Sequence, residues 1–192
     1  MCIESDTAGR VAVALIHHPV YDKHRHVVTT AVTNLELHDI ARAAKTFGLH
    51  RYFVVTPVEE QQALAGRIQA HWLGGWGSSY NPRRKEALEL LRVVSTLDDA
   101  IMEMTDTFGT RPLLAVTGAK GRSNSLGTGQ LREQLATSNT PLLLLFGTGW
   151  GMTEELFNSA DFVLEPICGK SGYNHLSVRS AVSIYLDRLF GR

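Results

Sequence analysis

Short runs of apolar residues alternate along this chain with longer stretches in which apolar residues recur every three or four positions. The uninterrupted runs are typical of strands buried on both faces, and they predict strands at residues 11–16, 52–55, 93–94, 112–117, 141–146 and 162–164. The longer stretches have the period of amphipathic helices, which we predict at residues 34–47, 59–72, 82–91, 97–108, 130–136, 153–158 and 175–190. The glycine-containing residues 73–81 and 118–129 are expected to form loops.

The alternation of strands and helices predicts the fold class. Strands that are buried on both faces, with helices between them, form a mostly parallel sheet covered by helices on both faces. We therefore expect a single α/β domain over residues 11–192, preceded by a flexible polar tail at residues 1–10. Ligands of such sheets bind beyond the carboxyl ends of the strands, so the loops to examine follow Ile16, Val55, Thr117, Phe146 and Leu164.

Composition and charge narrow the class of protein. With 44% hydrophobic and 20% charged residues over 192 positions, the chain resembles an ordinary globular protein. Lysine plus arginine and aspartate plus glutamate each total 19, so any RNA-binding surface must be local. Cys2 and Cys168 form neither a disulfide framework nor a zinc motif, which favours a reducing cytoplasm. No apolar segment has the length of a membrane span and no signal peptide is evident, so we expect no membrane association.

The strongest local signal is a glycine-rich turn after the most apolar predicted strand. Gly147, Gly149 and Gly151 alternate there with Thr148 and Trp150. Glycine permits backbone conformations and a close ligand approach that a Cβ atom would prevent, so we expect a side chain at Gly149 to intrude on a ligand cleft. Two alternatives remain open, an ordinary strand-to-helix turn and the phosphate loop of a nucleotide- or dinucleotide-binding enzyme. The dinucleotide motif, however, needs its third glycine one position beyond Gly151.

A second shaped loop joins the last predicted strand to the last predicted helix. It contains Glu165, Pro166 and Gly169, and it ends near Asn174, whose side chain is suited to cap a helix. Gly169, Lys170 and Ser171 match the end of a P-loop motif. The first glycine of that motif would fall at position 164, where the chain has leucine, so we reject a P-loop.

Together these segments resemble the C-terminal signature of SPOUT methyltransferases. The signature consists of an apolar strand with a glycine-rich turn at residues 142–151, a strand ending around a proline at residues 163–167, and an asparagine before a final helix at residues 173–178. The run YNHLSVR at residues 173–179 and the run TNLELHDIAR at residues 33–42 are similar to an uncharacterised bacterial subfamily related to the tRNA guanine-N1 methyltransferases. The resemblance therefore extends over nearly the whole chain.

The resemblance implies a deep trefoil knot at the C-terminus, a homodimer with its site near the subunit interface, and S-adenosylmethionine as the cofactor in the knotted cleft. It implies that backbone groups of Phe146, Gly147, Gly149, Ile167 and Leu176 hold the adenine and ribose, and an apolar slot with backbone donors and acceptors does suit an adenine ring. The full set of cofactor-binding candidates is Thr117, Gly118, Phe146, Gly147, Thr148, Gly149, Gly151, Glu165, Pro166, Ile167, Gly169, Tyr173, Asn174 and Leu176.

Candidates for catalysis also follow from the resemblance. Methyl transfer requires in-line positioning of the acceptor, and in some cases a base or a cation that acts on it. In several SPOUT branches an arginine of the first motif has this role, and Arg42 matches it by its neighbours. His38 and Glu36 stand where glycine and asparagine are usual, so a solvated helix arginine is an equal alternative. Asp39 and Asn174 are further catalytic candidates, and for Asp39 the alternative is a salt bridge on the helix surface.

Histidines cluster after the first predicted strand, at residues 17–26. Their spacing matches no common metal site and methyl transfer by this fold needs no metal, so we expect none. We expect Lys23 and Arg25 to contact RNA phosphates instead. The aromatic residues Trp72, Trp76 and Tyr80 either stack on bases or pack within the fold.

The leading hypothesis is an S-adenosylmethionine-dependent RNA methyltransferase that acts on tRNA or rRNA, at a base nitrogen or a ribose 2′-hydroxyl. A nucleotide- or dinucleotide-binding enzyme that uses the turn at residues 147–151 is one alternative. An RNA-binding module without turnover is the other.

Overall fold

The computed structural model describes residues 5–192, and within them seven strands form one sheet in the order β5-β4-β1-β8-β6-β9-β7. Every neighbouring pair in this sheet is parallel. The strands are β1 Val11–Ile16, β4 Arg51–Val55, β5 Leu91–Val94, β6 Leu113–Val116, β7 Ser125–Leu126, β8 Leu142–Gly147 and β9 Phe162–Leu164. The predicted mostly parallel sheet of an α/β domain is thereby confirmed.

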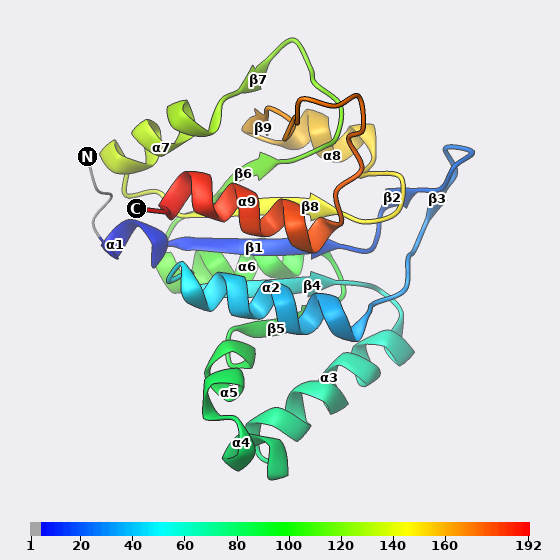
Figure 1. Ribbon diagram of the computed structural model, residues 1–192, viewed down its shortest axis with the longest axis vertical. Coiled ribbons are helices and arrows are strands. Elements are labelled where there is room, and N and C mark those ends of the chain that lie inside the picture. The colour runs from blue at the N-terminus through cyan, green and yellow to red at the C-terminus, as the bar shows by residue number, and fades with distance from the viewer. Residues whose placement is uncertain (1–4) are drawn as a thin grey trace.

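Helices cover both faces of the sheet (Figure 1). They are α1 Ser5–Ala8, α2 Asn34–Thr46, α3 Glu59–Leu73, α4 Trp76–Tyr80, α5 Pro82–Leu88, α6 Leu97–Phe108, α7 Thr128–Thr137, α8 Glu154–Ser159 and α9 Val178–Phe190. Apolar side chains of α2, α3, α5, α7 and α9 pack in one hydrophobic cluster, and those of α6 and α8 pack in the other. In Figure 1, α2 and α9 lie side by side in front of the sheet and α6 lies behind it.

The two-sided core follows from the period of a strand, because successive side chains point to opposite faces. Val13 and Leu15 of β1 lie in the α2–α9 cluster, whereas Ala14 and Ile16 lie in the α6–α8 cluster. All six residues of β1 are buried. This explains why the strand appears in the sequence as an unbroken apolar run rather than an alternating one.

Local signals in the sequence define the helix boundaries. Thr33 and Glu36 form a capping box at the start of α2, and Thr96 and Asp99 form another at the start of α6. Helix α6 ends at Gly109, whose left-handed φ of 72° suits a residue without a side chain.

Several sequence-based predictions about local structure were wrong. The final helix begins at Val178 rather than at residue 175, and its cap is Ser177, which accepts a hydrogen bond from the Ser180 N–H; Asn174 does not cap it. The predicted glycine-rich break contains α4, and the predicted loop at 118–129 contains β7. Of the expected N-terminal tail, the structure describes Ser5 onward, and it places α1 there with Ala8 buried.

A small antiparallel hairpin follows β1 and projects beyond the carboxyl end of the sheet, at the right of Figure 1. Its strands are β2 Val20–Tyr21 and β3 Val27–Val28. The Tyr21 N–H donates to the Gly151 carbonyl at 2.8 Å, and the Tyr21 carbonyl accepts from the Trp150 N–H at 2.9 Å. These two bonds fix the hairpin against the glycine-rich turn.

Candidate functional site

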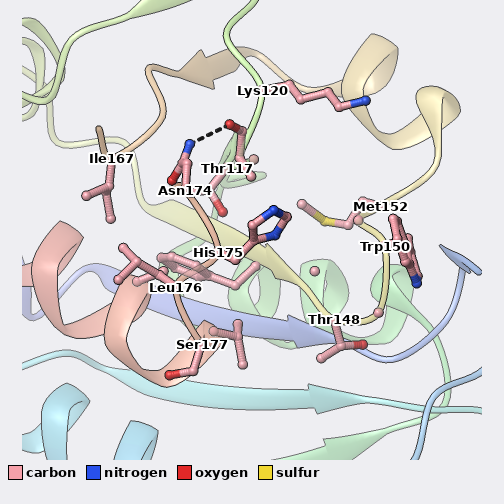
Figure 2. Close-up of a pocket in the computed structure, with 18 of the residues that line it drawn as sticks. Thr117, Lys120, Thr148, Trp150, Met152, Ile167, Asn174, His175, Leu176 and Ser177 are labelled. Carbon is pink, nitrogen blue, oxygen red and sulfur yellow. Dashed lines mark hydrogen bonds between the residues drawn. The ribbon is translucent and has the colours of Figure 1, made fainter. Parts of the chain in front are cut away.

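A cavity of about 810 Å³ lies beyond the carboxyl ends of β1, β6 and β8. This volume is within the range of pockets that enclose a small-molecule ligand. Figure 2 shows Ile167, Leu176 and Ser177 on one side of the cavity and Thr148, Trp150 and Met152 on the other, with His175 between them in this view. The cavity is therefore built from the loop before α9 and from the glycine-rich turn after β8.

Most of the cofactor-binding candidates meet in this one cavity. Those that line it are Thr117, Gly118, Phe146, Gly147, Thr148, Gly149, Gly151, Ile167, Asn174 and Leu176. Four other candidates, Glu165, Pro166, Gly169 and Tyr173, are not among the residues that line it. All four belong to the loop between β9 and α9, which reaches the cavity through Ile167, Asn174 and Leu176.

The glycine-rich turn has left-handed backbone at Gly149 (φ 57°) and Gly151 (φ 99°). A Cβ atom at Gly149 would lie 3.0 Å from the Tyr21 carbonyl oxygen and 3.2 Å from Thr30 Cγ2. The expectation that a side chain at Gly149 would enter the ligand cleft was therefore wrong. The nearest groups are Tyr21 of the hairpin and Thr30, which follows the hairpin. The glycine allows the hairpin to pack closely on the turn.

A network of hydrogen bonds around a buried histidine stabilises the glycine-rich turn. His17, which is fully buried, shares a hydrogen bond of 2.9 Å between its Nδ1 and Thr30 Oγ1, and Thr30 Oγ1 lies 2.5 Å from Thr148 Oγ1. The Thr148 hydroxyl also donates to the Ile16 carbonyl at 3.0 Å. Burial lowers the pKa of His17, so a neutral imidazole holds this network.

The loop between β9 and α9 is fixed at two points. The Asn174 side-chain amide donates to the Ala119 carbonyl at 2.9 Å, and the Tyr185 hydroxyl donates to the Glu165 carbonyl at 2.6 Å. Tyr185 is buried, packs edge-on against Phe146 and lines the cavity. Burial raises the pKa of Tyr185 to about 12, so its hydroxyl is a proton donor throughout the neutral pH range.

This anchoring leads to a prediction about stability. Replacement of Tyr185 by alanine should cost about 3–5 kcal/mol of the free energy of unfolding, since it removes a buried ring. Replacement by phenylalanine keeps the ring but leaves the Glu165 carbonyl without its donor, at a cost of about 1–3 kcal/mol. Urea unfolding of both variants measures these values, with Tyr80→Phe as the control because Tyr80 is 69% exposed. A Tyr185→Phe variant as stable as the parent would contradict a role for the hydroxyl.

Charged side chains surround the mouth of the cavity. Glu154 accepts hydrogen bonds from Arg122 at 2.7 Å and from Arg25 at 3.5 Å, and the bond from Arg122 is the main cause of a lowered pKa of the Glu154 carboxyl. Both guanidinium groups also lie over aromatic rings, Arg25 over Tyr21 and Arg122 over Phe157. Glu154 therefore holds two arginines in fixed orientations at the entrance.

Arg42 and Asp39 lie elsewhere, in a second cavity of about 560 Å³ between α2, α3 and α5. Asp39 accepts a hydrogen bond of 2.5 Å from Arg179, a residue of α9 that lines the larger cavity. The structure thus gives Asp39 the salt bridge that was the alternative to a catalytic role, although its partner is on another helix.

The comparisons with known proteins agree with this geometry. A family of SAM-dependent RNA methyltransferases matches residues 10–191 of the chain. The chain belongs to this family. The leading hypothesis of an S-adenosylmethionine-dependent RNA methyltransferase is thereby confirmed, and the dinucleotide-binding enzyme and the module without turnover are set aside.

Two relatives show how far the similarity extends. The methyltransferase is 40% identical over 182 residues to an uncharacterized protein of Aquifex aeolicus, covering 95% of this chain and 89% of the relative. It is 42% identical over 178 residues to a tRNA (guanine-N(1)-)-methyltransferase of Oleidesulfovibrio alaskensis. That alignment covers 93% of this chain but only 41% of the relative, so the chain spans less than half of the longer protein.

A solved methyltransferase structure has a similar fold. The SpoU methyltransferase AviRb of Streptomyces viridochromogenes, solved in complex with the cofactor AdoMet, aligns with a TM-score of 0.56 at 14% sequence identity. The alignment covers 94% of this methyltransferase and 56% of that chain. At this identity the likeness concerns the fold alone.

Two further findings concern metals and membranes. Within residues 5–192, no three or more histidine, cysteine, aspartate or glutamate side chains form a group that could hold a metal ion. No helix in this described part of the methyltransferase is both long and apolar enough to cross a membrane.

The sequence prediction missed several residues that line the larger cavity. Leu35 and Glu36 come from the first turn of α2, and Met152 and Phe157 follow the glycine-rich turn. His175 was assigned to the final helix, but it lies in the loop before it. The position of Met152 and Phe157 just after the turn was a usable signal, whereas nothing local in the sequence identifies Leu35.

Proposed function

We propose that this methyltransferase binds S-adenosylmethionine in the larger cavity and methylates N1 of a guanine in tRNA. The curated relatives from Oleidesulfovibrio and Nitratidesulfovibrio, both named tRNA (guanine-N(1)-)-methyltransferase, are 42% and 40% identical to this chain. They support the choice of tRNA over rRNA and of a base nitrogen over a ribose hydroxyl. Each is more than twice as long as the aligned segment, so the substrate is inferred from only part of each protein.

One observation carries the assignment of the cofactor site. The resemblance to SPOUT enzymes assigns the adenine and ribose to backbone groups of Phe146, Gly147, Gly149, Ile167 and Leu176, and all five line the same cavity. Phe146, Ile167 and Leu176 provide an apolar slot, and the three loops provide backbone donors and acceptors. These are the properties of a site for an adenine ring.

The same cavity is poorly suited to a pyrophosphate. The helix that follows the glycine-rich turn, α8, has Glu154 and Glu155 in its first turn. Carboxylates at a helix N-terminus already occupy the favourable end of the helix dipole, and they repel a phosphate. A dinucleotide motif also needs an acid about 20 residues beyond its glycines to bind the ribose. Glu165, which lies near that spacing, is not among the residues lining the cavity. These features support adenosine rather than a dinucleotide as the ligand.

S-adenosylmethionine supplies the methyl group as a sulfonium. Methylation of guanine at N1 also requires the N1 proton to leave, so a proton acceptor must lie near the base. The acceptors that line the cavity are Asp22, Glu36, Glu154 and His175.

We assign the proton acceptor to His175. Asp22 accepts from the backbone N–H groups of His24 and His26, Glu36 belongs to the capping box of α2, and Glu154 is held by two arginines. His175 contacts the Tyr173 ring, and its ring nitrogens have no hydrogen bond with any group in residues 5–192. It is therefore the acceptor with a nitrogen available to the substrate.

Asn174 has a positioning role in this proposal. Its amide nitrogen donates to the Ala119 carbonyl, which leaves its amide oxygen to accept a hydrogen bond from cofactor or base.

The homodimer, the trefoil knot and a cytoplasmic location belong to the same proposal. The hydrogen bond from Asn174 to Ala119 supports a C-terminal segment that passes by the 117–127 loop, and the exposed apolar residues Leu35, Trp150 and Leu176 at the cavity support a covering partner.

The test is transfer of a labelled methyl group from S-adenosylmethionine to RNA from cells that lack the protein. We expect label in the tRNA fraction, recovered as 1-methylguanosine after nuclease digestion, and little label in RNA from cells that have the protein. Label recovered only as a 2′-O-methylated nucleoside, or only in rRNA, would contradict the proposed acceptor. No transfer to any RNA would contradict the proposed function as a whole.

A further inference from the structure

We propose that the second cavity, between α2, α3 and α5, is a phosphate-binding pocket for the backbone of the substrate RNA. The inference rests on the proposed function, because it requires that the chain acts on RNA. In this proposal Arg42 binds a phosphate of the RNA backbone and does not contact the reacting atoms.

Three arginines from three different helices converge on this cavity. Arg42 comes from α2, Arg67 from α3 and Arg84 from α5. None of the three has a carboxylate ion-pair partner within residues 5–192. Asp39 is the one acidic residue that lines the cavity in this described part of the chain, and it is paired with Arg179. The cavity therefore has an excess of positive charge, in a protein whose overall formal charge is zero.

Two polar atoms in the wall of the cavity are buried and lack a hydrogen-bond partner among the residues that the structure describes. They are Nε of Arg84 and Nδ1 of His38. Burial, and then the charge of Arg84, lower the pKa of His38, so the cation in the wall is the arginine and not the histidine. A buried guanidinium N–H is unfavourable unless an acceptor reaches it, and phosphate oxygens match the planar geometry of arginine. This chemistry indicates an anionic oxygen ligand.

The aromatic residue of the cavity favours a phosphate over a base. Trp72 has its ring edge-on to His38 and to His71, with centroid distances of 5.5 and 5.2 Å, and the Arg84 guanidinium lies over it at 4.6 Å. The ring is therefore in contact with three side chains of the protein itself. The possibility that Trp72 stacks on a base is not favoured by this packing. The ring instead orients Arg84.

The two cavities share a wall, which places a phosphate site beside the methyl-transfer site. Leu35 lines both cavities, and the ion pair between Asp39 and Arg179 joins a residue of one to a residue of the other. Leu35 and Arg42 are separated by seven positions on α2, about 10 Å along the helix axis. An RNA strand with its target base in the larger cavity would thus pass over the start of α2 and reach Arg42 with its backbone.

The test compares two double variants that remove the same number of charges. Arg42→Gln/Arg67→Gln removes two exposed arginines of the second cavity, and Arg111→Gln/Arg188→Gln removes two exposed arginines that line neither cavity. Binding of tRNA is measured by fluorescence anisotropy over a series of salt concentrations. For the first variant we expect about a tenfold loss of affinity and a salt dependence reduced by about 1.5 in slope, as for two lost phosphate contacts. The affinity for S-adenosylmethionine should not change.

The control variant should keep the salt slope of the parent and nearly all of its affinity. Equal weakening by both variants would overturn the inference, since net charge alone would then explain the loss. An Arg42→Gln/Arg67→Gln variant with unchanged RNA binding but reduced kcat would also overturn it, because Arg42 would then act on the reacting atoms. If arginine-dependent tRNA binding is found without methyl transfer, the proposed function fails while the phosphate pocket stands.

Discussion

Replacement of Gly149 by valine is expected to lower the affinity for S-adenosylmethionine at least about 30-fold. Gly149 has a φ of 57°, a conformation that costs a β-branched residue about 1–3 kcal/mol. Its Cβ atom would lie 3.0 Å from the Tyr21 carbonyl, so the turn and the hairpin must also move apart. The cofactor can bind only when the turn has its native conformation. If restoring that conformation takes about 2 kcal/mol of the binding free energy, the affinity falls about 30-fold.

Calorimetric titration with S-adenosylmethionine measures this effect, and circular dichroism shows whether the sheet remains folded. Gly129→Val is the matched control. A Cβ atom at Gly129, in the first turn of α7, meets nothing within 4 Å, and valine is a better helix former than glycine. The control should bind as the parent does. Unchanged affinity in a folded Gly149→Val protein would remove the turn from the cofactor site.

The central strands were predictable because burial on both faces requires an unbroken run of apolar residues, which is visible in the sequence. The predicted limits of β1 and β9 match the structure, and β8 is displaced by one residue. Strand β5 was predicted at residues 93–94 but extends over Leu91–Val94, and β7 was missed. Both lie at the edges of the sheet, where side chains are only partly buried and pairing with a neighbour, rather than hydrophobicity, defines the strand.

The cavity was partly predictable for a different reason. Its glycine-rich turn and the loop before α9 carry local signals, because glycine and proline reflect backbone constraints that act within a few residues. The arginine–glutamate cluster at the mouth carries none, since Arg25 and Glu154 are 129 positions apart and meet only in the fold. Such contacts arise from tertiary packing and could not be read from spacing.

The structure separates Arg42 from the cavity that most of the cofactor-binding candidates line. The motif around Arg42 led to the expectation of a residue at the reacting atoms. In the structure, the first turn of α2 reaches the larger cavity through Leu35 and Glu36, whereas Arg42 lies two turns further along the helix and lines the second cavity. His38, one turn before Arg42, lines that second cavity with a half-buried imidazole whose Nδ1 is buried.

Replacement of His175 by glutamine is expected to reduce kcat for tRNA methylation about 100-fold. Removal of a general base typically costs a factor of this size or more. His175 lies in the larger cavity without a hydrogen-bond partner for its ring among the described residues, so the substitution removes no hydrogen bond of the fold and loses the ring contact with Tyr173. The affinity for S-adenosylmethionine should therefore remain within about twofold of the parent, a difference of less than 0.5 kcal/mol.

The comparison of kcat with cofactor affinity separates a proton acceptor from a residue that only shapes the cavity. Loss of a proton acceptor should lower kcat and leave the affinity for S-adenosylmethionine unchanged, whereas loss of a residue that shapes the cavity should lower both. His24→Gln serves as the control, since His24 is exposed on the hairpin and does not line the cavity. Full kcat in His175→Gln would transfer the role to a carboxylate. Glu36 would then be the first to examine, because it lines the cavity at the first turn of α2.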